Sequence, residues 1–181
     1  NLNVGVVKFL SYLLGEQSST VGLIFLPLWM MEGDATMCET QASTFGRALQ
    51  PSFTLEYRAM GDITQRYRNI DKFFCGSYRD FIPDHYQLGY QMVAHGNELT
   101  GRIIANDMAS LGPRRPWMIV SENWRMKHLF GFSTHELFQS TFRSLTDFWA
   151  TIPTPKNSSD ALPAPSAESY TTYAHPIEVD G

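Results

Sequence analysis

Apolar side chains recur at helical spacing throughout residues 1–150, and no alternating strand pattern of convincing length interrupts them. Proline, glycine and small polar residues divide this stretch into segments of helical length. At 181 residues the chain has the length of one domain. The sequence therefore predicts an all-α body over 1–150, a multi-helix array of about seven or eight helices.

The predicted helices follow from apolar periodicity and from residues that begin or end a helix. They are expected over Val4–Leu14, Pro27–Gly46, Pro51–Met60, Asp62–Phe74, Tyr86–His95, Leu99–Leu111, Trp117–Phe130 and Thr134–Trp149. A short helical turn is expected over 77–81, just before Pro83. Gly96 and Asn97 are expected to end their helix as a left-handed cap, and Gly112–Pro116 is expected to break the chain's helical path.

The composition changes after residue 150. Five of the ten prolines fall within 151–181, together with several serines, which predicts a Pro/Ser-rich linker or extended tail. Tyr170–Tyr173 and Ile177–Val179 have some strand character. They are consistent either with the start of a following C-terminal domain or with an arm that packs on the body.

Charge and hydropathy narrow the classes of partner. The net charge is −4, and the 14 lysines and arginines form no run denser than Arg114–Arg115, so no nucleic-acid partner is expected. The longest apolar stretch, Val21–Met31, is too short for the roughly 20 residues of a membrane-spanning helix. The two cysteines, Cys38 and Cys75, are compatible with either a disulfide or two free thiols.

Glu32 is the most unusual residue of the second predicted helix, because it directly follows a wholly apolar turn. On a helix, Glu32, Thr36 and Glu39 share one face. Two carboxylates on a core-forming segment require a cation or access to water. The open alternatives are a metal ion, an arginine such as Arg47, or partial exposure at a cleft.

Two short segments carry a resemblance to a known family. Residues 28–35, Leu-Trp-Met-Met-Glu-Gly-Asp-Ala, resemble the Trp-Leu-x-Glu-Gly-Phe-Ala element of gluzincin metallopeptidases, and residues 85–90 resemble their Tyr-x-Lys-Gly element. The resemblance implies that Glu32 is the third zinc ligand and that Glu39 supports the site. It also implies that the hydroxyl of Tyr86 stabilises the oxyanion of the tetrahedral intermediate, although Gln87 and Leu88 depart from the family's lysine.

A longer series of segments, 26–40, 46–47, 51–53 and 83–90, is similar in order and spacing to secreted gluzincin-like proteins of Bacteroidetes. This similarity implies the helical C-terminal half of a gluzincin catalytic domain, zinc as cofactor, a peptide or protein substrate and an exported protein, often with a C-terminal β-propeller. The His-Glu-x-x-His helix that such a peptidase needs is absent from the 181 residues, and His135–Gln139 is a poor substitute. The resemblance implies that this helix lies upstream of Asn1.

Two non-enzymatic alternatives stay open. A degenerate, metal-free member of the fold would be a helical binding module that holds a peptide or glycan between the Glu32 and Tyr86 helices. A purely structural helical domain remains if Glu32 is exposed and unpaired. Tyr86 itself is equally compatible with an ordinary amphipathic tyrosine whose hydroxyl reaches the surface.

Overall fold

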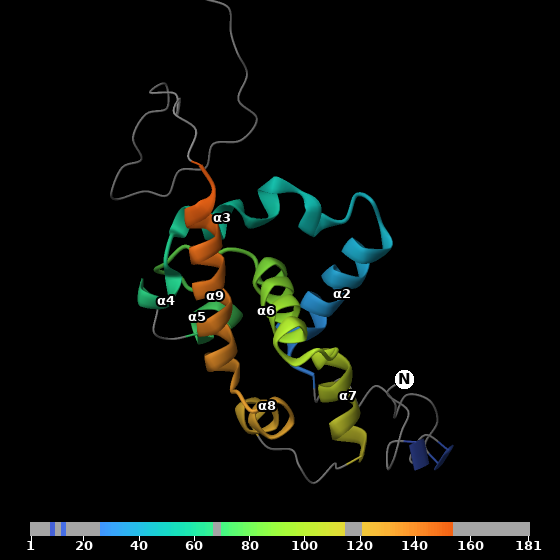
Figure 1. Cartoon of the computed structure of the whole chain (residues 1–181). Helices are drawn as coiled ribbons and strands as arrows, with labels where there is room; N and C mark the ends of the chain where they lie inside the picture. Colours follow the sequence, from blue (N-terminus) through green and yellow to red (C-terminus); the bar gives the residue numbers. More distant parts are fainter. Residues whose placement is uncertain (1–7, 10–11, 14–25, 67–69, 115–120, 154–181) are drawn as a thin grey trace, which may run out of the picture.

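The computed structural model describes residues 8–9, 12–13, 26–66, 70–114 and 121–153, and within these residues the fold is all-α, as predicted (Figure 1). No strand occurs in these ranges. The elements are α2 (Leu28–Ala42), η2 (Arg47–Leu49), η3 (Pro51–Thr54), α3 (Leu55–Met60), α4 (Ile63–Arg66), α5 (Asp71–Cys75), α6 (His85–Thr100), α7 (Ile104–Arg114), α8 (Glu122–Phe130) and α9 (Thr134–Thr151).

Helix α6 is the centre of the fold. It contacts α2 more extensively than any other pair of elements contact each other in the described part, and it also packs against α9, α7 and α5 (Figure 1). Its buried side chains, Leu88, Met92 and Val93, are apolar and recur at helical spacing. The helix that carries Tyr86 is therefore held by neighbours on several sides.

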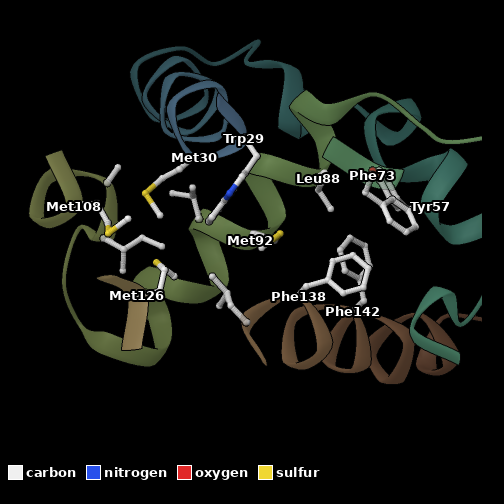
Figure 2. Close-up of a cluster of buried hydrophobic side chains, with 14 of the residues drawn as sticks. Trp29, Met30, Tyr57, Phe73, Leu88, Met92, Met108, Met126, Phe138 and Phe142 are labelled. Atoms are coloured by element: carbon white, nitrogen blue, oxygen red, sulfur yellow. The ribbon is translucent and has the colours of Figure 1, made fainter. Parts of the chain in front are cut away.

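The core combines methionines, branched aliphatic residues and aromatic rings. Figure 2 shows the side chains of Trp29 and Met30 of α2 extending into the core, with a cluster of aromatic rings near Leu88. Phe138 and Phe142 of α9 supply two of these rings, with centroids 5.0 Å apart. Aromatic pairs at this separation add to the stabilisation that burial alone provides.

Polar side-chain caps begin three of the helices, α6, α8 and α9. The Asp84 side chain accepts a hydrogen bond from the Tyr86 N–H at 3.0 Å and so caps α6. Ser121 caps α8, and Ser133 forms a reciprocal capping box with Glu136 at the start of α9. These caps satisfy amide groups that have no partner inside their own helix.

The predicted end of α6 is wrong. The helix continues through Gly96 and ends at Thr100, where Gly101 adopts the left-handed conformation with φ of 64°. Gly96 is buried instead, because a Cβ atom there would lie 2.6 Å from Cδ1 of Ile104. Its small size serves the packing of α6 against the next helix.

Several other boundaries also differ from the prediction. The helix expected over Leu99–Leu111 is α7, which begins at Ile104 and passes through Gly112 and Pro113 to Arg114. This shift occurs because Oδ1 of Asn97 accepts the Ile104 N–H and so begins α7 later. Residues 77–81 form no helical turn, since the Ser77 hydroxyl accepts amide hydrogen bonds from residues 79 and 80.

The second predicted helix ends earlier than expected, at Ala42, and the third begins with the 3₁₀ turn η3. The fourth is divided into α4 and α5, with residues 67–69 outside the described ranges. α8 starts at Glu122, later than predicted. α9 is confirmed: it begins at Thr134 as predicted and ends at Thr151, two residues later than expected. Most of the first predicted helix and the tail over 154–181 lie outside the described residues.

Two further predictions concern the chain as a whole. No helix in the described ranges has the length and apolar character needed to cross a membrane. Cys38 and Cys75 are both exposed and free, so the open choice between a disulfide and two thiols resolves to two thiols in this structure. The predicted division of the chain into a helical body over 1–150 and a linker or tail over 151–181 stays a prediction.

Candidate functional site

The candidate site lies where α2 crosses α6, and two glycines allow the crossing. A Cβ atom on Gly33 would lie 2.2 Å from the backbone carbon of Gly89. A Cβ atom on Gly89 would lie 2.1 Å from the backbone oxygen of Trp29. Since these contacts are backbone to backbone, no larger residue fits at either position without separating the helices. The crossing brings the residue before Gly33, Glu32, toward the start of α6.

Glu32 is half-buried at the edge of this crossing. Its backbone carbonyl accepts a hydrogen bond of 2.8 Å from the hydroxyl of Thr36, which is fully buried. Glu39, one turn further, is exposed. The three residues predicted to share a face therefore differ in solvent exposure: Thr36 is buried, Glu32 is half-buried and Glu39 is exposed.

Glu39 binds an arginine that follows α2. Its Oε2 atom accepts a hydrogen bond of 2.8 Å from Nε of Arg47 and lies 2.7 Å from Nη2 of the same side chain. The hydrogen bond from Arg47 lowers the pKa of the Glu39 carboxyl below its usual value. The sequence suggested Arg47 as a partner of Glu32, but its direct partner is Glu39.

Arg47 also contacts Tyr86 across the site. Its guanidinium carbon lies 5.1 Å from the centroid of the Tyr86 ring, within the range of a cation–π interaction. The pKa of Arg47 is raised, first by the hydrogen bond to Glu39 and then by the nearby Tyr86 and Glu32. Two of the three residues selected from the sequence, Glu39 and Tyr86, thus contact Arg47, and Glu32 lies within electrostatic range of it.

Glu32, the residue predicted as a zinc ligand, is one of the residues near Arg47. Glu32 has an oxygen donor of a type that zinc accepts and is half-buried, as a ligand at a cleft would be. Within the described ranges, no group of three or more His, Cys, Asp or Glu side chains is close enough to hold a metal. A zinc ion at Glu32 would therefore take its other ligands from residues beyond those described.

Gln87 and Leu88 stand where the resembled element leads to its lysine, and Gln87 makes a polar contact. Nε2 of Gln87 lies 3.5 Å from the Glu56 carboxylate of α3. Within the described part of the chain, neither Oε1 of Gln87 nor the hydroxyl of Tyr57 has a hydrogen-bond partner, although both atoms are buried. Burial raises the pKa of the Tyr57 phenol far above its usual value. Tyr57 belongs to α3, and Gln87 contacts the same helix through Glu56, so that α3 borders the site although the sequence did not connect it with the site.

The nearest approach to a zinc-peptidase helix in this chain has a structural role. In His135–Gln139, the carboxylate of Glu136 accepts the Ser133 N–H at 2.6 Å, and the Ser133 hydroxyl accepts the Glu136 N–H at 3.2 Å. This capping box begins α9 and accounts for the glutamate without a metal.

A separate hollow of about 510 Å³ lies between α6 and α9. Its lining includes Gln91, His95 and Glu98 of α6 together with Thr141 and Phe148 of α9. By helical spacing, these α6 residues occupy a different face of the helix from Tyr86. His95 lies 3.8 Å from the Glu98 carboxylate, a pairing within the same helix.

The comparisons with known proteins add no relative: no family model, no curated protein and no solved structure matches the chain. The gluzincin resemblance consequently depends on the two motifs and their spacing. Sequence reasoning missed the roles of Gly33 and Gly89, although each glycine belongs to one of those motifs. A small residue within a predicted core helix was the available signal of a close helix crossing.

Proposed function

We propose that this chain is the helical part of a zinc-dependent peptidase in which Glu32 is the third zinc ligand and Tyr86 stabilises the oxyanion. One observation supports the proposal above all. The glutamate and tyrosine motifs, which are distant in sequence, meet at the Gly33–Gly89 crossing, and both Glu32 and Tyr86 lie within electrostatic range of Arg47.

The proposed roles follow from the chemistry of each side chain. The Glu32 carboxylate provides one negatively charged oxygen ligand, and two histidines and a general base come from a His-Glu-x-x-His helix upstream of Asn1. Zinc, when bound, supplies a Lewis acid that activates water for attack on a peptide carbonyl. The Tyr86 hydroxyl donates a hydrogen bond to the carbonyl oxygen as negative charge develops there.

Glu39 has a supporting role in this proposal. It binds the guanidinium of Arg47 directly, so that the cation is engaged two helical turns away from Glu32. The Glu32 carboxylate is thereby left available for a metal. The peptide substrate, the exported location and a following C-terminal domain are parts of the same proposal, because they derive from the same family resemblance.

The first test is native mass spectrometry of the full-length protein, which reports bound zinc directly. We expect one zinc ion per chain in the wild type and its loss in Glu32→Gln. Asp34→Asn is the matched control, since it removes a half-buried carboxylate from the same helix and should retain zinc. Loss of zinc from both variants, or from neither, would contradict the assignment of Glu32.

Tyr86→Phe tests the second role. Removal of one oxyanion donor typically costs about a hundredfold or more in kcat, so we expect a loss of that size with zinc content and melting temperature unchanged. A wild-type protein that folds, holds no zinc and cleaves no peptide would instead favour the helical binding module.

A further inference from the structure

Arg47 is held in place by the local fold after α2. The chain turns back so tightly that a Cβ atom on Gly46 would lie 2.3 Å from Cα of Thr40. The Thr40 hydroxyl also accepts the N–H of Ala48 at 3.4 Å. The 3₁₀ turn that contains Arg47 is therefore fastened to the last turns of α2, beside Glu39.

The guanidinium has two defined neighbours. Glu39 fixes it through two N–H groups directed at a single carboxylate oxygen, at 2.7 and 2.8 Å. The other neighbour is the ring of Tyr86, 5.1 Å from the guanidinium carbon. The His85 ring also lies against Tyr86, with centroids 4.5 Å apart. The Tyr86 ring thus contacts Arg47 of η2 and the neighbouring His85 of α6.

We infer that Arg47 is a positioning residue for Tyr86, and that the Glu39–Arg47 pair holds the phenol ring in the orientation its hydroxyl needs at the reacting carbonyl. This inference rests on the proposed function. Tyr86 occupies the first turn of α6 and is only half-buried, so core packing alone does not fix its side chain. Stabilisation of an oxyanion requires a donor held in place before the charge develops.

The first experiment does not depend on activity. In full-length protein labelled with ¹³C at the tyrosine rings, the Tyr86 signal is assigned by its loss in Tyr86→Phe. We expect Arg47→Ala to shift that signal and Arg47→Lys to restore it only in part, because an ammonium group lacks the planar stacking surface of a guanidinium. Arg58→Ala, which removes an exposed arginine from α3, should leave the signal in place.

The second experiment is a double-mutant cycle on peptide hydrolysis. Arg47→Ala should lower kcat by roughly 3- to 30-fold with little change in KM, the range expected for loss of a cation–π contact. In the Tyr86→Phe background, Arg47→Ala should cost almost nothing more, because Arg47 acts through that tyrosine. Melting temperature and zinc content are measured for every variant to separate this effect from unfolding.

The outcomes separate the positioning role of Arg47 from the proposed zinc-dependent hydrolysis on which it rests. An unshifted Tyr86 signal in Arg47→Ala, or equal losses of kcat in both backgrounds, would overturn the positioning role while zinc-dependent hydrolysis stands. A wild-type protein without zinc and without hydrolysis would overturn both. A shifted ring signal in that case would show that Arg47 orders Tyr86 for a reason other than catalysis.

Discussion

Helix α6 meets its two main neighbours in contrasting ways. Against α2, the backbones touch at Gly33 and Gly89, with no side chain between them. On the side of α9, the contact is made by large side chains, including Phe138, which is fully buried. The first contact brings together the two segments that contain Glu32 and Tyr86, whereas the second buries large apolar side chains. A close approach builds the candidate site, and burial of aromatic rings stabilises the helix that carries it.

The largest expected effect comes from the aromatic contact. Phe138→Ala should reduce the free energy of unfolding by about 3–5 kcal/mol, because it removes a fully buried ring and leaves a cavity. Urea denaturation followed by circular dichroism measures the loss. Phe148→Ala, on the same helix but with the residue 60% exposed, should change stability by less than about 1 kcal/mol. Equal losses for the two variants would show that this contact is not the main source of stability.

The glycine contact gives the next effect. Gly33→Ala should destabilise the fold by about 1–3 kcal/mol or more, since the added methyl group meets backbone atoms that cannot move separately from their helix. Gly96→Ala is the matched control within α6, because the nearest atoms that its methyl group meets belong to the side chains of Ile104 and Leu137 rather than to the backbone. If thermal unfolding showed the control to be the more harmful variant, the tight α2–α6 crossing would be wrong.

A smaller effect concerns how α9 begins. Ser133→Ala removes the capping box and should cost about 1 kcal/mol, since amide groups at the helix start lose their acceptor. Amide hydrogen exchange should then be faster in the first turn of α9 than in its centre. Ser144→Ala, at an exposed position of the same helix, should leave that exchange pattern unchanged.

The smallest expected effect is the pH dependence of the stability that the exposed Glu39–Arg47 ion pair contributes. Because Arg47 lowers the folded-state pKa of Glu39, the pair contributes stability above the ordinary carboxyl pKa near 4.5, and this contribution is lost as the pH falls through the lowered value. Melting temperatures of wild type and Glu39→Gln should therefore differ near pH 7 and converge in acid. A difference that grows toward low pH would reverse the sign and contradict the pairing. The exposure of both side chains keeps the effect small.

Much of the helical fold could be predicted because its signals are local. Pro27 and Asp84 precede helices that begin at the next residue, and the apolar periodicity of α9 predicted that helix almost to its ends. Gly96 shows where local reasoning fails. A glycine near the end of an apolar pattern is typical of a cap, but here it is buried against Ile104, and the cap is Gly101.

The candidate site likewise has features that local sequence predicts and contacts that it does not. The sequence by itself determined that carboxylates follow an apolar turn at Glu32 and that a capped helix carries Tyr86, because periodicity and capping depend on residues within a few positions. Only the tertiary structure decided that Glu39, and not Glu32, binds Arg47, and that Arg47 reaches Tyr86. The physical reason is that both contacts depend on close approaches of the backbone. The Glu39–Arg47 pair depends on the tight return of the chain at Gly46 against Thr40, and the contact with Tyr86 depends also on the α2–α6 crossing at Gly33 and Gly89.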